Sequence, residues 1–162
     1  IAKQELSTWP VFGILAKLTR TIFISRSSSS ALKQLQLIKH LLFQSERLIL
    51  FPEGTSSDGR KVLPFKPSLF EAPIKADAIV QPLTIRYEKI NGMPVDRWSK
   101  PFLAWYGDMD LLPHLWQSLS LGTITIKLVF HEPIKAVVFR NRKKLANHCQ
   151  KIIAFESEKP YR

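Results

Sequence analysis

The chain has 162 residues, 45% of them apolar, which is the length and composition of one ordinary globular domain. Lysine and arginine total 24 against 13 aspartates and glutamates, so the formal net charge is +11 and an anionic partner is expected. Six glycines, a single cysteine and no persistent heptad pattern exclude a collagen, a disulfide scaffold and a coiled coil.

The sequence shows no targeting signal and no membrane span. Its first residue is Ile1, and no basic stretch followed by an apolar one opens it, so we expect a fragment or a processed product rather than a signal peptide. The longest stretch free of charged residues, Leu111–Ile126, has 16 residues. This is shorter than the roughly 20 apolar residues that a spanning helix needs.

The first half of the chain predicts a strand, a helix and two more strands. A short strand is expected at Thr21–Ser25. A helix follows over Ser27–Leu42, because serines that can cap free amides precede apolar residues spaced three and four apart. The apolar run Arg47–Phe51 predicts a buried strand, and Ala78–Tyr87, rich in β-branched residues, predicts another. This order of elements indicates a βαβ unit.

The second half predicts two strands and two helices. Phe102–Tyr106 and Thr123–Phe130 have strand character, and Leu111–Leu121 predicts a helix between them. The last helix is expected over Asn141–Glu156, with an apolar stripe opposite a basic face. We expect one partial α/β domain over residues 1–162, with a mostly parallel or mixed sheet flanked by helices. Its motifs lie in residues 1–87, and further strands and the basic helix lie in residues 100–158.

The most distinctive segment is Phe51–Ser57, where a predicted strand ends and the chain turns. Ligands of open α/β sheets bind at the carboxyl ends of strands. Pro52 restricts the backbone, Gly54 permits a turn that brings amides near a ligand, and Thr55 and Ser56 supply hydroxyl donors. Such a loop suits a phosphate or a carbonyl oxygen, although by composition alone an ordinary turn is the better interpretation.

Basic residues concentrate near the end of the chain. Residues 127–162 carry nine lysines and arginines against three glutamates, which is +6 of the total charge. A solvated helix face and an anionic partner explain this pattern equally well. Because aromatic residues between the basic ones are scarce, membrane headgroups or an acidic protein fit better, and we expect no nucleic-acid partner.

The Phe51–Ser57 segment closely resembles the third conserved block of the glycerolipid acyltransferase family, whose members acylate lysophosphatidic acid and related lysolipids. Thr21–Arg26 resembles the second block of the family, and Val80–Leu83 resembles the fourth, in the right order. Flanking stretches also resemble the family or its bacterial members, namely Ala2–Lys3, Trp9–Gly13, Leu63–Lys66, Trp105–Met109 and Pro113–Trp116.

The resemblance implies an enzyme of phospholipid biosynthesis. Its reaction would move a fatty acyl group from an acyl carrier protein or coenzyme A thioester to the free hydroxyl of a lysophospholipid. With lysophosphatidic acid as acceptor, the product is phosphatidic acid. No cofactor is implied, and the histidines and the cysteine show no metal-ligand spacing. The implied substrate-binding residues are Phe23, Arg26, Phe51, Pro52, Glu53, Gly54, Thr55, Ser56 and Lys3, with Pro82 shaping the pocket.

Single residues of the implied acceptor site have candidate roles, some of them with alternatives. Arg26 is the candidate for the acceptor phosphate, because a guanidinium makes bidentate charged hydrogen bonds to it. Glu53 could bind the acceptor's glycerol hydroxyl, orient Arg26 or cap a turn. Lys3 is either a second cation at the phosphate or a solvated lysine, and for Lys66 we favour solvent. Cys149 is expected to be a buried thiol without a catalytic role.

The family's catalytic block, a histidine followed after four intervening residues by an aspartate, is absent from this sequence. The resemblance places it before the second block, so we expect it upstream of Ile1. There the histidine would deprotonate the acceptor hydroxyl, and the aspartate would orient the imidazole. The chain as given is then expected to be inactive. Arg20 and Ser56 also depart from the family, which often has glycine and arginine at these places, and either could retune headgroup binding.

A lysolipid acceptor implies contact with a bilayer, and we expect the cytoplasmic face of the bacterial inner membrane. Leu6–Ala16 is the candidate interfacial segment, although core packing explains the same residues at least as well. An anionic membrane surface and an acidic acyl carrier protein both suit the basic charge. Two alternatives stay open, a non-catalytic lipid- or anion-binding module and a lyso-ornithine-lipid acyltransferase.

Overall fold

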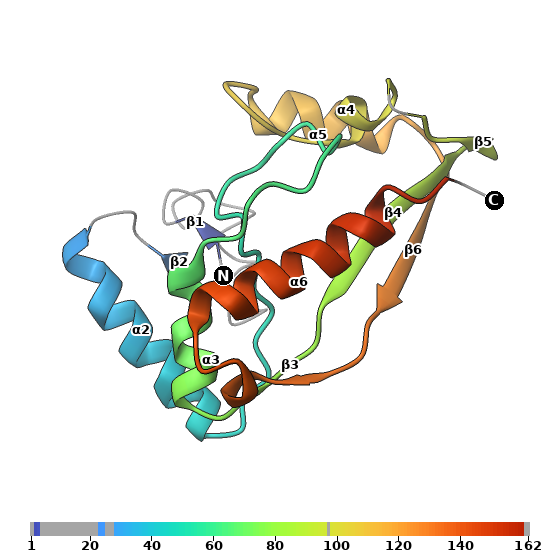
Figure 1. The fold of residues 1–162 in the computed structure, drawn as a ribbon. Helices are drawn as coiled ribbons and strands as arrows, with labels where there is room; N and C mark the ends of the chain where they lie inside the picture. The colour runs from blue at the N-terminus through green and yellow to red at the C-terminus, as the bar shows by residue number, and fades with distance from the viewer. Residues whose placement is uncertain (1, 4–22, 25–27, 97, 161–162) are drawn as a thin grey trace.

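Short strands and helices alternate along the chain (Figure 1). The computed structural model describes residues 2–3, 23–24, 28–96 and 98–160, with side chains from residue 35 onward. Its elements are β1 (Ala2–Lys3), β2 (Phe23–Ile24), α2 (Ser28–Phe43), η2 (Pro67–Phe70), α3 (Glu71–Lys75), β3 (Ile79–Val80), β4 (Leu83–Ile90), β5 (Met93–Pro94), α4 (Lys100–Leu103), α5 (Leu111–Leu119), β6 (Ile124–Phe130), β7 (Ile134–Lys135), η3 (Ala136–Phe139) and α6 (Arg142–Ser157).

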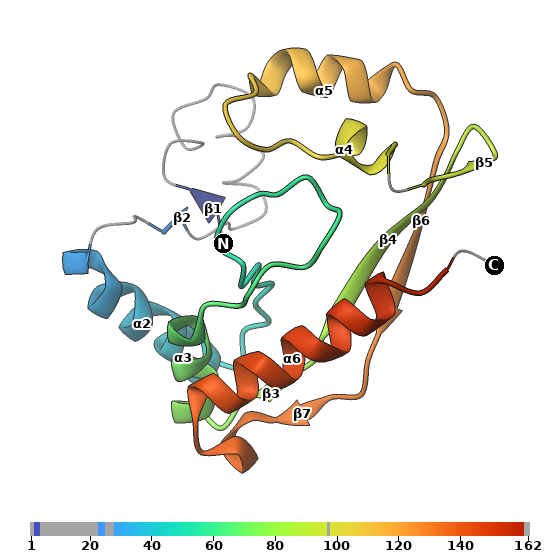
Figure 2. The same ribbon diagram turned by 45° about the horizontal axis from the view of Figure 1, so that its top comes forward.

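The described strands pair in both directions, which is the mixed arrangement of an α/β fold. β1 and β2 pair in parallel, whereas β3 pairs antiparallel with β7. A three-stranded antiparallel sheet has the order β5-β4-β6, and its longest pairing runs from Leu83↔Phe130 to Ile90↔Ile124. Figure 2 shows α6 running along β4, while α4 and α5 form a separate layer beyond the β5 end of this sheet.

The predicted strand Ala78–Tyr87 is divided into β3 and β4 at Pro82. A proline has no backbone N–H for a sheet ladder. Its carbonyl still accepts a hydrogen bond from the His131 backbone N–H at 3.0 Å, at the matching gap between β6 and β7. The two halves therefore pair with different strands.

Two predicted strands are wrong. Arg47–Phe51 is irregular because none of the described strands pairs with this run. Ile49 and Phe51 are 71% and 62% exposed, so the run is not buried either. Phe102–Tyr106 instead begins inside α4. Asp96 Oδ1 accepts hydrogen bonds from the backbone N–H groups of Trp98 and Ser99 at 3.0 and 2.7 Å, which turns the chain into a helix.

The three predicted helices are confirmed, with ends set by local chemistry. At the end of α2, the Ser45 N–H donates to the Leu42 carbonyl and the Glu46 N–H to the Leu41 carbonyl, with Ser45 at a φ of 60°. This is a Schellman-type ending in which serine occupies the usual glycine position. The N-cap of α6 is Asn141, whose side chain accepts from the Lys143 and Lys144 N–H groups.

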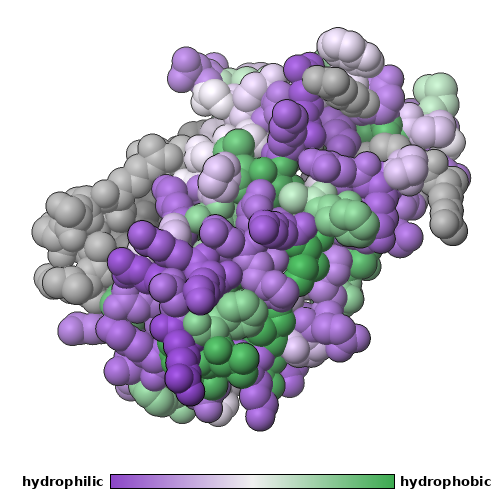
Figure 3. All heavy atoms as spheres, in the orientation of Figure 1, coloured by the Kyte–Doolittle hydropathy of each residue, from purple (hydrophilic) through white to green (hydrophobic). Residues whose placement is uncertain are grey.

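One core cluster joins the segment around Phe65 to η2, η3 and α6. Its buried members are Phe65, Phe70, Ala136, Leu145, Ala146 and Cys149. Cys149 is buried as expected, and the pKa of its thiol is raised to about 11 by desolvation. The outer face in Figure 3 is largely hydrophilic, with apolar patches between the charged side chains.

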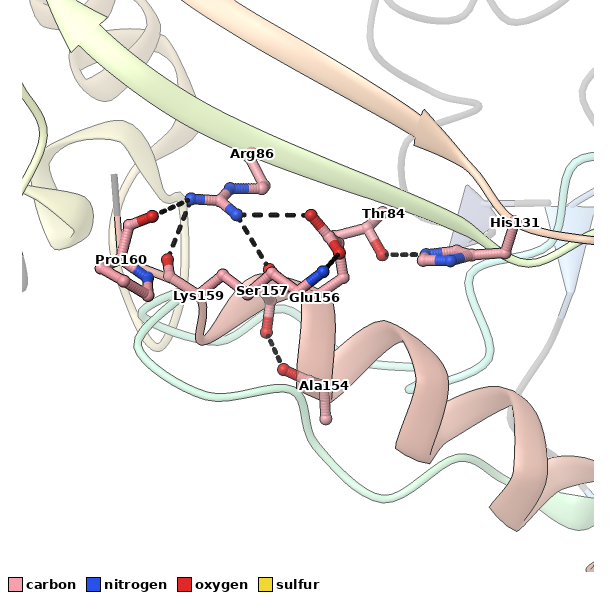
Figure 4. Close-up of polar contacts among 8 residues, drawn as sticks. All are labelled: Thr84, Arg86, His131, Ala154, Glu156, Ser157, Lys159 and Pro160. Carbon is pink, nitrogen blue, oxygen red and sulfur yellow. Dashed lines mark hydrogen bonds and ion pairs between the residues drawn. The ribbon is translucent and has the colours of Figure 1, made fainter. Parts of the chain in front are cut away.

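Arg86 of β4 holds the C-terminal end of α6 (Figure 4). Its buried guanidinium donates to the backbone carbonyls of Glu156 at 3.1 Å and Lys159 at 2.9 Å, and forms an ion pair with the Glu156 carboxylate at 3.4 Å. The pKa of Glu156 is lowered by Lys159, whose hydrogen bond acts most strongly, and by Arg86. A cation at these carbonyls complements the negative end of the helix dipole.

Candidate functional site

The loop of residues 51–57, called the PEGT loop below, is built around a tight turn. The Gly54 N–H donates to the Phe51 carbonyl at 3.2 Å, and Gly54 has a φ of +65°. This region of backbone space is open to glycine at little cost. The Pro52 carbonyl accepts a hydrogen bond from the Lys66 N–H at 2.8 Å, which ties the turn to the returning chain.

That returning chain is anchored in the core. Phe65 is 8% exposed, and its ring stacks on Phe70 with centroids 6.2 Å apart. The next residue, Lys66, is exposed, and its carbonyl accepts a hydrogen bond from the Leu69 N–H at 3.1 Å. The backbone of Lys66 is therefore held on both sides, while its side chain is directed out of the core.

The Lys66 side chain lies across Gly54. A Cβ placed on Gly54 would be 2.7 Å from the Lys66 Nζ, 2.8 Å from Cε and 2.9 Å from Cδ. Only a residue without a side chain leaves room for this approach. Among the residues that the structure describes, no carboxylate forms an ion pair with Lys66. The turn thus carries an ammonium group that is available to an anion.

The sequence favoured solvent for Lys66, and the residue is exposed, but the sequence did not show that its side chain lies across Gly54. The signal was present in two separate places, a glycine in the turn and a lysine that follows a buried phenylalanine. Neither one shows that the chain folds back so that the two meet.

Glu53 is the titratable group of the PEGT loop. Its side chain is half-buried, and desolvation raises its pKa, although a hydrogen bond from the Leu63 backbone opposes the rise. This hydrogen bond joins Glu53 to the chain ten residues later, and its turn-capping role stays a prediction. The other two roles left open for Glu53 involve a substrate hydroxyl or Arg26, and Arg26 lies outside the described residues.

The hydroxyl groups of the loop face solvent. Thr55 and Ser56 are exposed, and Thr55 Oγ1 donates to the Ser56 carbonyl at 3.4 Å. Ser57 Oγ accepts from the Gly59 N–H at 3.3 Å. Phe51 is exposed and Pro52 is half-buried, so the loop presents one aromatic ring, two hydroxyls and the Lys66 ammonium at its surface.

The remaining predicted site residues lie elsewhere or are described only in part. Lys3 and Phe23 lie on β1 and β2, whose parallel pairing sets Ala2 against Phe23 and Lys3 against Ile24, and only their backbone is described. Pro82 is buried, and its carbonyl accepts the hydrogen bond from the His131 backbone N–H. Arg26, Arg20 and Leu6–Ala16 lie outside the described residues.

One depression in the described part of the chain lies away from the PEGT loop. A depression of about 560 Å³ between α3 and the start of α6 contains Lys75, Arg140, Arg142 and Lys143, but Glu71 pairs with Lys75 and Arg142, and none of its lining residues belongs to the PEGT loop. Within the described ranges, no group of three metal-ligating side chains is present, and no helix has the length and apolarity to span a bilayer.

The chain is similar in sequence to known acyltransferases. Residues 1–86 match the model of the acyltransferase family. Over 154 residues, 90% of the chain, it is 40% identical to a lyso-ornithine lipid O-acyltransferase of Brucella abortus and 38% identical to one of Rhizobium meliloti. Over 80% of the chain, it is 34% identical to a 1-acyl-sn-glycerol-3-phosphate acyltransferase of Neisseria gonorrhoeae.

The chain spans only part of these curated relatives, namely 58%, 53% and 49% of their lengths. No solved structure matches it significantly.

Proposed function

Since the chain belongs to the glycerolipid acyltransferase family, we propose that the protein transfers a fatty acyl group from a thioester to the free hydroxyl of a lysolipid. The donor is an acyl carrier protein or coenzyme A thioester. The reaction takes place in phospholipid and related lipid synthesis at the cytoplasmic face of the bacterial inner membrane, where the acceptor resides.

The observation that carries this proposal is the ammonium group of Lys66 across the PEGT loop. Gly54 leaves the space for it, and the Pro52 carbonyl fixes the Lys66 backbone. An ammonium group beside exposed hydroxyls and a glycine turn suits an anionic oxygen, because charge-assisted hydrogen bonds to such a group are strong. Ser56 brings no charge to the loop, so the cation at this turn is Lys66 of the returning chain.

Two acceptors fit such a site. Lysophosphatidic acid offers a phosphate and would give phosphatidic acid, whereas an ornithine lipid offers the carboxylate of its amino acid. The identities of 40% and 38% to lyso-ornithine lipid O-acyltransferases exceed the 34% to a 1-acyl-sn-glycerol-3-phosphate acyltransferase. This difference favours lyso-ornithine lipid as the acceptor, with lysophosphatidic acid as the second candidate.

The reaction needs a base that removes the acceptor's hydroxyl proton. We assign it to the histidine of the family's His–Asp block, which the resemblance places before Ile1. The hydroxyl oxygen then attacks the thioester carbonyl, the carbon–sulfur bond breaks, and the proton passes from the histidine to the leaving thiolate. Lys66 and the PEGT loop hold the acceptor anion, together with Arg26, Lys3 and Phe23, and Pro82 helps to shape the pocket.

An acceptor titration with the full-length gene product tests this role. Each acceptor is assayed with each donor in wild type, Lys66→Ala, Lys66→Arg and the control Lys151→Ala, which changes an exposed lysine of α6. We expect Lys66→Ala to raise the acceptor KM about tenfold with kcat little changed. Lys66→Arg should bring the KM most of the way back to the wild-type value, and Lys151→Ala should have the wild-type KM.

Two results would contradict the proposal in different ways. If Lys66→Ala and Lys151→Ala give the same acceptor KM, Lys66 does not bind the anion. If the folded wild-type protein turns over neither acceptor with either donor yet binds lysolipid, the non-catalytic lipid-binding module is the correct interpretation.

A further inference from the structure

Helix α5 exposes three large apolar side chains and buries polar atoms of His114 and Ser118, while Leu111 and Leu115 are half-buried. Leu112, Trp116 and Leu119 are 62%, 77% and 69% exposed. His114 is buried, and His114 Nε2 and Ser118 Oγ are buried atoms without a hydrogen-bond partner. A helix on the surface of a protein in water normally has the opposite arrangement, with its apolar stripe facing the core.

The exposed residues form one continuous patch, here called the α5 stripe (Leu112, Trp116 and Leu119). Their spacing of four and three residues places them on one face of the helix. The stripe lies within the uncharged stretch Leu111–Ile126, so no charged side chain of the helix needs to be desolvated with it. Tryptophan and leucine at such positions are typical of the boundary between lipid headgroups and acyl chains.

The layer that contains α5 adjoins the segment following the PEGT loop. A Cβ on Gly59 would lie 4.0 Å from the Cβ of Ala104, in the connection between α4 and α5. The Arg60 guanidinium lies 5.5 Å from the ring centroid of Trp98, just before α4. Figure 2 shows this segment reaching toward α4. The layer that contains α5 therefore lies beside the segment that follows the PEGT loop.

We infer that the α5 stripe docks the protein on a lipid bilayer, with α5 lying in the plane of the interface. Nine residues of helix extend about 14 Å, which is too short to span a bilayer but suits an interfacial helix. Two exposed basic residues lie in the adjoining segment, where anionic headgroups would be within reach, namely Lys61 and Arg60, of which Arg60 also pairs with Asp58 at 3.5 Å. The choice of a lipid surface as occupant rests on the proposed function, because the proposed acceptor is a membrane lipid.

This docking surface differs from the segment favoured by the sequence, Leu6–Ala16, which lies outside the described residues. It is formed by a helix from the second half of the chain. The docking would hold the loop that binds the acceptor anion beside the headgroups of the membrane.

Fluorescence quenching by brominated lipids tests the inference at one residue. The full-length gene product is mixed with phosphatidylcholine–phosphatidylglycerol vesicles whose acyl chains carry bromine, which quenches nearby tryptophan. We expect quenching in wild type, a clear reduction in Trp116→Phe, and no such reduction in Trp105→Phe. Trp105 is the matched control, because its Nε1–H donates to the Met109 carbonyl at 2.6 Å within the protein.

Vesicle sedimentation tests the two leucines. We expect Leu112→Ser with Leu119→Ser to weaken vesicle binding about tenfold, because interfacial binding scales with buried apolar area. The control pair is Val138→Ser with Phe155→Ser, which changes two residues of 71% exposure on η3 and α6 and should leave vesicle binding at its wild-type value.

Three outcomes decide the inference. Equal quenching in wild type and Trp116→Phe would overturn it, as would a double-serine variant that binds vesicles normally but loses self-association in analytical ultracentrifugation. Trp116 quenching without acyl transfer to either lysolipid would support the docking surface and refute the proposed function. Acyl transfer without Trp116 quenching would support the proposed function and refute the docking surface.

Discussion

At the scale of single residues, the PEGT loop depends on one absent side chain. Gly54 has a positive φ, as the other described glycines do, but among them it alone has the side chain of a lysine within 3 Å of the place where its Cβ would be. The turn conformation and the approach of Lys66 therefore make separate demands on the same residue. A second glycine with positive φ but no lysine beside it separates the effect of the turn conformation from the effect of the Lys66 approach.

Gly54→Ala and Gly59→Ala form the matched pair. Both residues have positive φ, +65° and +72°, so each alanine should cost about 1 kcal/mol of unfolding free energy, measured by urea denaturation. Lys66 can swing away from an added methyl at little cost in stability. Only Gly54→Ala displaces the ammonium, so only this variant should raise the acceptor KM as Lys66→Ala does. Equal KM values in the two glycine variants would show that the position of Lys66 does not matter for binding.

The half-buried carboxyl of Glu53 gives the loop a pH dependence. Burial raises its pKa in the folded state above the ordinary value of 4.5, so the folded protein binds more protons than the unfolded chain in the window from that value up to the raised pKa. The contribution of Glu53 to unfolding free energy therefore falls as pH rises through this window.

Glu53→Gln should remove this contribution. Urea denaturation between pH 4 and pH 7 should show that the difference in stability, variant minus wild type, increases with pH. Glu71 is a suitable comparison, because hydrogen bonding from Lys75 lowers its pKa, so the difference for Glu71→Gln should change in the opposite direction. A Glu53→Gln difference that stays constant with pH would mean that this carboxyl is not desolvated.

At the scale of elements, helices formed where the sequence predicted them and strands often did not. The stripes of α2, α5 and α6 and the cap at Asn141 act within a few residues of the chain. The run Arg47–Phe51 has the composition of a strand but no described neighbour, and a strand without a neighbour leaves its backbone groups to water. Ala78–Tyr87 has neighbours on both sides of Pro82, but they are two different strands, so it became β3 and β4.

Asn141→Ala tests the cap that starts α6. The side chain accepts hydrogen bonds from the Lys143 N–H at 2.8 Å and the Lys144 N–H at 3.4 Å, and their loss should lower unfolding free energy by about 1 kcal/mol. Asn147→Ala, at an exposed position inside the same helix, should be neutral or slightly stabilising because alanine is the better helix former. Equal effects of the two changes would mean that the cap contributes nothing.

At the scale of the whole molecule, one core connects the site to the last helix. Phe65, which directs Lys66 toward the PEGT loop, belongs to the same buried cluster as Leu145 and Cys149 of α6. The position of the Lys66 ammonium thus depends on packing between segments about 80 residues apart in the chain.

Thiol labelling of Cys149 reports the integrity of this core. With a pKa of about 11, roughly one thiol in a thousand is ionised at pH 8, and the group is also 2% exposed. We expect slow labelling in the full-length gene product, followed at Cys149 by mass spectrometry, and rapid labelling in urea. Leu145→Ala, which removes a fully buried side chain and about 2 to 5 kcal/mol of stability, should accelerate it. Native labelling as fast as that in urea would contradict a closed core.

The sequence by itself determined the α/β class, three helices with their approximate ends, the family and the loop that carries its most distinctive motif. These depend on patterns within a few residues, such as apolar spacing, caps and turn residues, and local patterns can be read without knowing the fold. The resemblance added expectations for the acceptor class and for the residues that would bind it.

Only the tertiary structure decided which strands pair, that Lys66 lies across Gly54 and that α5 turns its α5 stripe outward. The apolar pattern of α5 predicts a helix whichever way that helix faces, and the lysine and the glycine are separated by eleven residues of irregular chain. Such outcomes depend on contacts between distant segments, and the free energy of those contacts is set by the partner as much as by the residue itself.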